Sequence, residues 1–176
     1  MDELDLGWQQ IVGKKPILVI AAHNFSHGRE GVIKFADMGT GDLARKICEK
    51  YNYHALVSTR AQLDPNWYSS SNFREKIKEI IIQYNISLII DLHGKKLNNK
   101  HLIELMGNDS FIRKFNLNVD SFKKNQQLTL AEELDKQTPV LQVEIREDGR
   151  VSTIDDQKYL EAWQKITGLL DKLDET

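Results

Sequence analysis

Short apolar runs alternate along this chain with longer segments in which apolar residues recur every three or four positions. Short runs rich in β-branched side chains are typical of buried strands, whereas the three-to-four spacing is typical of amphipathic helices. The apolar runs predict five strands, at 16–23, 54–59, 87–93, 101–107 and 140–146. Pro16 opens the first strand and Pro139 precedes the last, positions at which a sheet tolerates proline.

Helices are predicted between these strands from their starts and their apolar faces. Thr40 is placed to cap the first helix, with Asp42 in its first turn. Asn72 and Glu75 have capping spacing at the start of the second helix. Two short helices are predicted at 110–115 and 129–136. The closing helix has one apolar side, formed by Leu160, Trp163, Ile166, Leu170 and Leu173.

The alternation of strands and helices predicts an α/β fold whose largely parallel sheet is covered on both faces. The sequence contains no internal repeat, low-complexity segment or obvious linker. One domain spanning residues 1–176 is therefore expected, a length within the usual size of a single domain.

Composition narrows the function classes. The chain has 24 Lys and Arg against 26 Asp and Glu, and a net charge of −2 argues against a bulk preference for nucleic acid or an anionic membrane. The single cysteine, Cys48, excludes an intrachain disulfide. No apolar run reaches membrane-spanning length, and the acidic start of the chain lacks the pattern of a secretory signal. A cytoplasmic protein is expected.

Polar and ionisable residues gather where the predicted strands end. In open α/β sheets, ligands bind beyond the carboxyl ends of the strands. The residues at these ends are His23, then Arg60 with Asp64 and Asn66, then Asp91 and His93, and finally Glu144 and Arg146. Two imidazoles and one carboxylate are a typical catalytic zinc set, which leaves a fourth position open for water. His54 and His101 begin strands and are expected at the opposite edge.

Each of these residues also has an ordinary structural explanation. A lone histidine at a strand end is most often a hydrogen-bonded structural residue, Asp91 can cap a turn, and the two arginines can form surface ion pairs. Alternation in the last strand places Glu144 on one polar face, as in an edge strand. Their convergence at one end of four strands nevertheless favours a site. The stretch at 39–42, "GTGD", lacks the rest of a phosphate-binding loop.

Five stretches, taken in order, resemble the N-formylglutamate amidohydrolase family, which belongs with the zinc carboxypeptidase-like and aspartoacylase-like hydrolases. They are "PILVIAAHN", "FADMGTGDLARKI", "STRAQLDPN", "LIIDLHG" and "VLQVEIR", and they span roughly residues 16–146. Poly-γ-glutamate hydrolases are similar as well. The resemblance implies a mixed-sheet, phosphorylase/hydrolase-like fold and zinc-dependent amide hydrolysis.

The resemblance also implies roles for individual residues. It makes His23, Asp37 and His93 the zinc ligands, and it places Glu144 where such enzymes keep a general base. Arg60 stands where a cation holds the substrate carboxylate or the developing oxyanion.

Several alternatives stay open at this point. The segment "SHGRE" leaves His27 and Glu30 as a competing pair of ligands for His23 and Asp37, although the stretch before the helix at residue 40 favours the latter. The expected activity is hydrolysis of an N-acyl amino acid or a glutamyl-type amide, on a small carboxylate-bearing substrate that Arg60, Asn66 and Arg146 bind. The rivals are a small zinc carboxypeptidase or γ-glutamyl hydrolase, and a silent carboxylate-binding module of the same fold.

Overall fold

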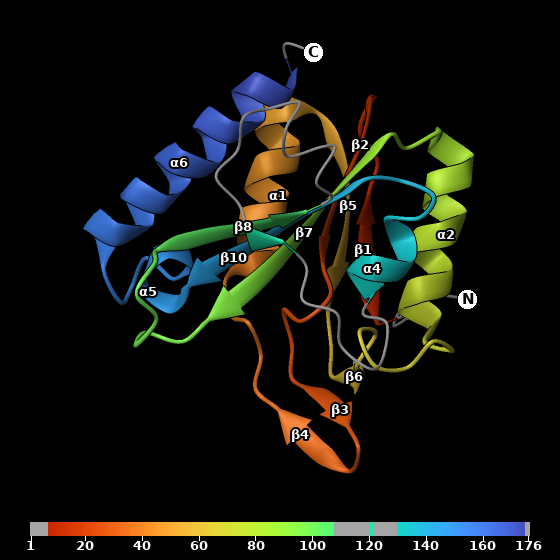
Figure 1. Cartoon of the computed structure of the whole chain (residues 1–176), viewed down its shortest axis with the longest axis horizontal. Coiled ribbons are helices and arrows are strands. Elements are labelled where there is room, and N and C mark those ends of the chain that lie inside the picture. Colours follow the sequence, from red (N-terminus) through yellow and green to blue (C-terminus); the bar gives the residue numbers. More distant parts are fainter. Residues whose placement is uncertain (1–6, 108–119, 122–129, 175–176) are drawn as a thin grey trace.

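The structure is a computed structural model that describes residues 7–107, 120–121 and 130–174. The helix predicted at 110–115, and the start of the one predicted at 129–136, lie outside the described residues. A seven-stranded sheet forms the centre of the molecule (Figure 1). Its order is β1 (Trp8–Ile11), β5 (Tyr53–Ser58), β2 (Lys15–Ala21), β7 (Leu88–Lys95), β10 (Val140–Arg146), β8 (Ile103–Gly107) and β9 (Asp120–Ser121).

The central strands β5, β2, β7 and β10 run parallel, whereas β1 pairs antiparallel with β5 and β8 antiparallel with β10. The predicted mixed, mostly parallel sheet is therefore confirmed. The direction of β8 overturns one expectation. Its start pairs Ile103 with Ile145, near the carboxyl end of β10, so His101 lies at the same edge as the strand ends of interest. His54, near the start of β5, lies at the opposite edge as expected.

Helices cover both faces of this sheet. On one face, α1 (Thr40–Tyr51) and α6 (Asp156–Asp174) pack against alternate strand residues such as Val19 and Ala21. On the other face, α2 (Asn72–Tyr84) and α4 (Leu130–Leu134) pack against Leu18 and Ile20. Because both faces are buried, the central strands read as continuous apolar runs. No helix in the described ranges combines the length and apolar character needed to cross a membrane.

A smaller sheet stands beyond the carboxyl ends of the parallel strands (Figure 1). It has the order β4 (Val32–Lys34), β3 (His27–Arg29) and β6 (Gln62–Leu63), and β3 and β4 form a hairpin. None of these strands was predicted, because strands of two or three residues carry too little pattern to separate them from loops. A short helix, α5 (Glu147–Arg150), follows β10.

Two predicted helix caps differ from the structure. Gly39, at φ 87°, is the N-cap of α1, and the Thr40 hydroxyl instead donates to the Asp37 carbonyl at 2.8 Å. The N-cap of α2 is Ser71, whose side chain accepts from the Arg74 backbone N–H, so the cap lies one residue before the predicted Asn72.

Candidate metal centre

Neighbouring strand ends bring two of the histidines together. His23 follows β2 by two residues, and His93 lies within β7, the parallel neighbour of β2. Asp37 approaches from the loop between β4 and α1. Its backbone N–H donates to the His23 carbonyl at 2.7 Å, and its own carbonyl accepts from Thr40. These contacts fix the aspartate beside the histidines, although all three residues come from different segments.

Glycines hold the Asp37 loop against the rest of the molecule. A Cβ at Gly39 would lie 2.2 Å from the Arg150 carbonyl oxygen, and one at Gly41 would lie 2.6 Å from the side chain of Asn24. The Asn24 Oδ1 accepts from the Gly41 backbone N–H at 2.9 Å. The "GTGD" stretch is therefore explained by close packing at the start of α1.

The three predicted ligands present their atoms to a common point. The Nδ1 atoms of His23 and His93 are 3.3 Å apart, and Asp37 Oδ2 lies 3.9 Å from the first and 3.8 Å from the second. Two atoms bound about 2.0–2.1 Å from a tetrahedral zinc ion lie roughly 3.3–3.4 Å apart. The donor set and its spacing therefore fit a zinc ion after shifts of a few tenths of an ångström.

A buried carboxylate stands behind each histidine. His93 Nε2 lies 3.0 Å from Asp91 Oδ2, and His23 Nε2 lies 2.9 Å from Asp64 Oδ1. Both aspartates are almost fully buried. A carboxylate at this position holds the proton on Nε2 and leaves the Nδ1 lone pair for a metal. The outer pairing therefore matches the arrangement of ligating histidines in metal sites.

Neighbouring charges shift the pKa values of His93 and Asp64 in this cluster. Burial lowers the pKa of His93, but the charge and hydrogen bond of Asp91 outweigh it, with smaller contributions from Glu144 and Asp37, so the pKa is raised to about 10. Burial raises the pKa of Asp64, yet its hydrogen bond and ion pair with His23 prevail, and the pKa lies below its usual value. At neutral pH the imidazole of His93 therefore carries a proton on both nitrogens, and a metal would displace the proton on Nδ1.

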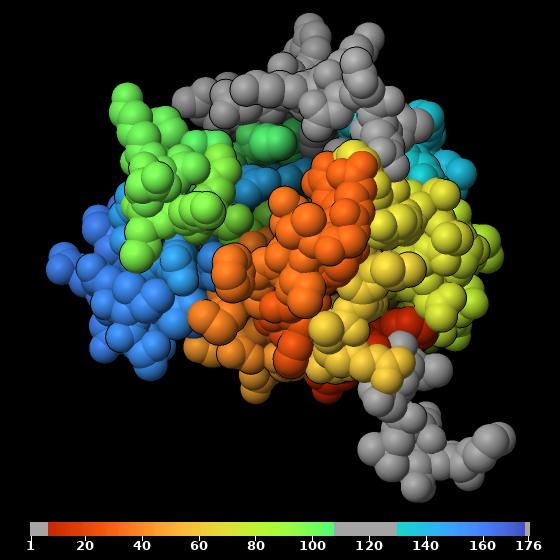
Figure 2. All heavy atoms as spheres, turned by 90° about the horizontal axis from the view of Figure 1, so that it is seen from below, coloured from red at the N-terminus to blue at the C-terminus, as the bar shows by residue number. Residues whose placement is uncertain are grey.

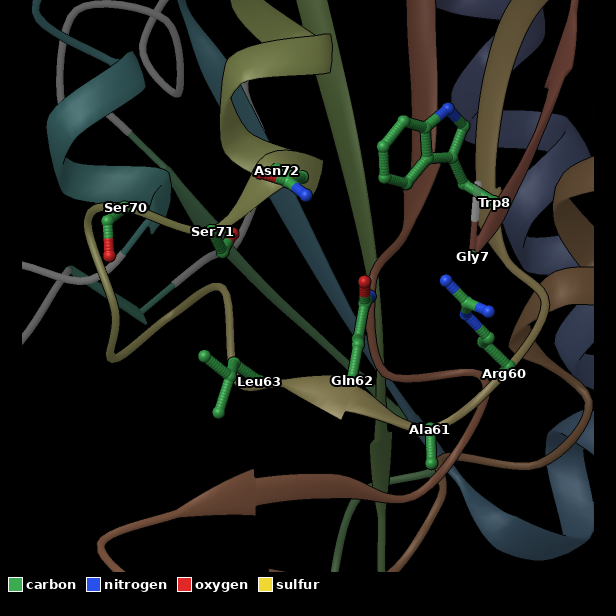
Figure 3. A pocket seen from close by; sticks show the side chains of 9 residues that line it. All are labelled: Gly7, Trp8, Arg60, Ala61, Gln62, Leu63, Ser70, Ser71 and Asn72. Carbon is green, nitrogen blue, oxygen red and sulfur yellow. The ribbon is translucent and has the colours of Figure 1, made fainter. Parts of the chain in front are cut away.

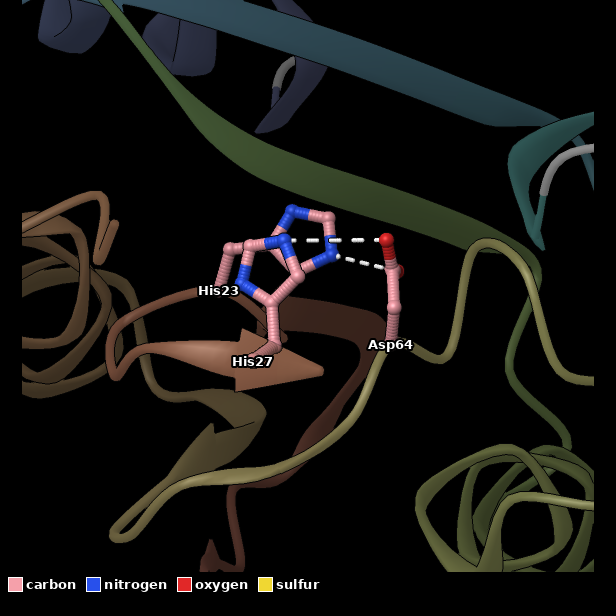
Figure 4. A group of neighbouring side chains, drawn as sticks. All are labelled: His23, His27 and Asp64. Atoms are coloured by element: carbon pink, nitrogen blue, oxygen red, sulfur yellow. Dashed lines mark hydrogen bonds and ion pairs between the residues drawn. The ribbon is translucent and has the colours of Figure 1, made fainter. Parts of the chain in front are cut away.

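The described residues contain a second group that offers metal ligands: His23, His27 and Asp64 (Figure 4). The rings of His23 and His27 stack with centroids 4.0 Å apart, and His27 Nε2 lies 3.6 Å from Asp64 Oδ2. Here His23 would use Nε2, the atom that is hydrogen-bonded to Asp64. A metal in this group would replace that hydrogen bond, whereas a metal between Asp37 and His93 leaves it in place.

The competing pair that contains Glu30 is not assembled. Glu30 lies in the exposed hairpin turn, where its backbone N–H donates to the Tyr68 hydroxyl, and it belongs to neither group. The partner of His27 is Asp64, which sequence spacing does not reveal because the two residues lie 37 positions apart.

Glu144 lies beside His93, as the register of β10 and β7 pairs the two residues directly. Paired residues on neighbouring strands project from the same face of a sheet. Glu144 is half-buried, and its Oε1 accepts from Gln142 Nε2 at 2.6 Å. Gln142 was not singled out from the sequence, although its position two residues before Glu144 places it on the same face.

The three predicted substrate-binding residues, Arg60, Asn66 and Arg146, do not line the cavity that contains Asp37 and Arg150. Arg60 lines a cavity of about 430 Å³ with Gly7, Trp8 and others (Figure 3). A second cavity, which adjoins Asp37, shares no lining residue with this one. The Arg146 guanidinium donates two hydrogen bonds, of 2.8 and 2.9 Å, to the Asp148 carboxylate. Asn66 supports the site indirectly, since its backbone N–H donates to Asp64 Oδ1 at 2.8 Å.

A cavity of about 890 Å³ adjoins Asp37, between the β3–β4 hairpin and the residues that follow β7. The guanidinium of Arg150 forms part of its wall. Arg150 Nε donates to the Ile145 carbonyl, Nη1 donates to the Met38 carbonyl, and a Cβ at Gly94 would lie 2.7 Å from the guanidinium. Arg150 was not predicted from the sequence, because it reaches the strand ends only by folding back through α5.

No family model matches the sequence, and no curated protein matches it either. The structure is similar to Pyrococcus furiosus PbaA, described as an archaeal homolog of a proteasome-assembly chaperone, with 13% identity, 96% of this chain and 86% of that chain covered, and a TM-score of 0.51.

Two hydrolases are also among the similar structures. A bacteriophage poly-gamma-glutamate hydrolase has 11% identity, covers 82% of this chain and 73% of its own, and has a TM-score of 0.45. The pyroglutamyl peptidase I from Bacillus amyloliquefaciens has 7% identity, 92% and 93% coverage, and a TM-score of 0.42. The PbaA likeness concerns the fold alone, and the two hydrolases fall below the similarity at which an activity follows. The sequence comparisons leave the resemblance to N-formylglutamate amidohydrolases without support.

Proposed function

We propose that this protein is a zinc-dependent hydrolase that cleaves an amide bond of an N-acyl amino acid or a glutamyl-type substrate. One observation carries the proposal. Two imidazole Nδ1 atoms and one carboxylate oxygen, on His23, His93 and Asp37, face one another at 3.3–3.9 Å. A set of two histidines and one carboxylate leaves a fourth position for water, which is typical of catalytic zinc.

The residues around the ligands have distinct tasks. Asp91 and Asp64 hold the two imidazoles in one tautomer and one orientation. Zinc, when bound, lowers the pKa of its water toward about 7 and polarises the amide carbonyl. Glu144, next to His93 on the same face of the sheet, accepts the proton of the attacking water and passes it to the leaving amine. Gln142 orients the Glu144 carboxylate through its 2.6 Å hydrogen bond.

The substrate is proposed to carry a free carboxylate. Arg60 is expected to bind it, and the cavity beside Asp37 offers three further cations, Arg150, Lys96 and Lys34. A rigidly held guanidinium and two lysines provide the positive charge that a carboxylate requires. Substrate binding is also proposed for Arg60, Asn66 and Arg146. Substitution of each residue should change kcat/KM on substrates that carry a free carboxylate, and an unchanged kcat/KM would remove that residue from the substrate-binding set.

Metal analysis tests the proposal directly. Protein purified without a metal-affinity tag should contain about one zinc per chain. His93→Ala should lose it, whereas the His101→Ala variant, which changes an exposed histidine at the same edge of the sheet, should keep it. His27→Ala should keep it as well, because His27 belongs only to the second group. Full zinc occupancy in His93→Ala would remove His93 from the ligand set.

Product analysis then separates the activities. Release of a free amino acid from N-acyl amino acids supports the proposed reaction. Stepwise removal of carboxyl-terminal residues from peptides would indicate a small carboxypeptidase, and cleavage of γ-linked glutamyl chains a γ-glutamyl hydrolase. Binding of acyl amino acids without turnover or zinc would indicate the silent carboxylate-binding module.

A further inference from the structure

We propose that the cavity beside Asp37 is a binding site for an amphipathic acyl amino acid, in which an apolar acyl chain packs on the β3–β4 hairpin and a carboxylate faces Lys96, Lys34 and Arg150. This inference rests on the proposed function and deepens it, because it names the substrate class. A short acyl group such as formyl would leave most of the cavity empty.

Apolar side chains are exposed to an unusual extent around this cavity. The exposed fractions of Phe35, Ile33, Val32 and Leu97 are 91%, 77%, 55% and 51%. These four of the eleven large exposed apolar residues in the described parts of the chain line one cavity. Single apolar residues on a surface are ordinary, but a group of them rimmed by charge marks a ligand groove or an interaction site.

The hairpin that carries Val32 and Ile33, with Phe35 directly after it, is held in place on its other side. β3 pairs with β6, the guanidinium of Arg29 stacks over the Trp67 ring at 3.7 Å, and the Glu30 backbone N–H donates to the Tyr68 hydroxyl. The outer strand β4 keeps its side chains exposed. Figure 2 looks onto this face and shows the hairpin, in orange, beside the residues after β7, in green. The apolar surface is thus presented by an anchored element.

The charges of the cavity favour an anionic ligand. Four cations line it, Lys34, Lys95, Lys96 and Arg150, against the two acids Asp37 and Glu147. Lys95 is paired with Glu104, whereas Lys34 and Lys96 have no ion pair with any acid in the described ranges. Asp37 directs its carboxylate toward the two histidines, where a metal would neutralise it. The remaining positive charge is complementary to a carboxylate.

The size and position of the cavity fit such a ligand. Small-molecule sites commonly have volumes of roughly 300–1,000 Å³, with apolar walls and a few polar groups that fix orientation. The cavity has about 890 Å³ and reaches Asp37, one of the three proposed ligands. An acyl amino acid bound here would place its amide at the Asp37 end, between the apolar hairpin and the cations.

The test uses a series of N-acyl-L-glutamates with acetyl, butanoyl, octanoyl and dodecanoyl chains. Binding is measured by calorimetry on the zinc-free wild-type protein, and hydrolysis is measured separately on the zinc-loaded protein. Affinity should rise with chain length. Ile33→Ser should weaken binding of the octanoyl compound about tenfold and leave the acetyl compound nearly unchanged, because only the longer chain buries the isoleucine.

Matched controls make the result specific. Ile82→Ser changes an isoleucine of almost equal exposure, 78%, on α2 and should alter neither affinity. Lys96→Gln should weaken the binding of octanoyl-glutamate more than the binding of the corresponding diamide. Equal binding of all chain lengths, or equal effects at Ile33 and Ile82, would overturn the inference. If hydrolysis proceeds without such a chain-length preference, the proposed function stands and only the inference fails. If binding follows the pattern but no amide is cleaved, the hydrolase assignment fails and the binding site stands.

Discussion

The carboxylate behind His93 offers the sharpest test of the metal centre. Asp91→Asn replaces a fully buried carboxylate with an amide of the same shape. Asp91 Oδ2 accepts from His93 Nε2 at 3.0 Å and so keeps the Nδ1 lone pair directed toward Asp37. An asparagine either accepts this hydrogen bond without charge or donates to Nε2. In the second case the ring proton moves to Nδ1, the atom that a metal would use.

The expected loss follows from this geometry. Removing the carboxylate partner of a ligating histidine typically lowers metal affinity about 10–100-fold, or roughly 1.4–2.7 kcal/mol. Asp64→Asn should have a similar effect through His23, because its hydrogen bond of 2.9 Å is equivalent. Asp42→Asn is the matched control, since this aspartate has a side chain that is 78% exposed and pairs with Arg45 on the surface of α1. It should leave zinc affinity unchanged.

Zinc affinity is measured by competition with a chromophoric chelator, and circular dichroism of the metal-free proteins checks that each variant folds. The two asparagine variants also separate the two candidate groups. In the second group Asp64 is itself a ligand and Asp91 takes no part. Wild-type affinity in Asp91→Asn, together with near-complete loss in Asp64→Asn, would refute the proposed ligand set and place the metal between His27 and Asp64.

Three further predictions concern catalysis, the substrate and stability. Glu144→Gln should retain zinc and lower turnover on the order of 100-fold or more, and an active variant would leave Glu144 as a polar residue on a strand face. Arg60→Lys should lower kcat/KM more for a carboxylate substrate than for its neutral amide if Arg60 binds that carboxylate, and kinetics on this pair decide between substrate binding and a role in its own cavity. Burial lowers the pKa of His54, whose Nδ1 accepts from the Gly13 backbone N–H, so the folded state resists protonation. Stability from this residue should therefore be lost as pH falls below about 6.5, by at most about 1.4 kcal/mol per pH unit. Urea unfolding at pH 7 and pH 5 should show a weaker pH dependence in His54→Gln, and an unchanged dependence would contradict this account.

The sequence predicted the elements whose pattern is local. The apolar runs of β2, β5, β7 and β10, and the apolar faces of α1, α2 and α6, are all present in the structure. It missed β1 and the small sheet, because strands of two to four residues carry too little pattern to separate them from loops. It also misplaced His101, since no local signal distinguishes an antiparallel β8 from a parallel one. The direction of β8 depends on its pairing with β10, whose partner residues are 34 or more positions away in the sequence.

The candidate site divides in the same way. His23 and His93 were expected together because adjacent parallel strands bring their carboxyl ends to one edge. Arg60 follows the same rule but leaves from β5, which β2 separates from β7, and it lies against Gly7 and Trp8. Arg150 reaches the strand ends from outside the sheet. Strand order therefore decides which end residues meet, and a single sequence does not reveal strand order.

One face of the sheet shows why this cluster is hard to explain by stability alone. Toward the amino ends of the strands, Leu18, Ile89 and Val140 lie side by side and are fully buried. Two residues further along β7, Asp91 replaces the expected apolar residue with a carboxylate that is 0% exposed, and its Oδ1 has no hydrogen-bond partner among the residues described. Burying charged groups is unfavourable unless they are paired, and replacing such groups by apolar residues is often neutral or stabilising. An apolar residue at position 91 would continue the core of the face that α2 covers. Asp91 is paired with His93 at 3.0 Å, and we propose that the pair is retained because it helps to hold a cation. Under the proposed function, a metal-free protein should gain stability when zinc is added, by RT ln(1 + [Zn²⁺]/Kd), or about 2.7 kcal/mol at a hundredfold excess over Kd.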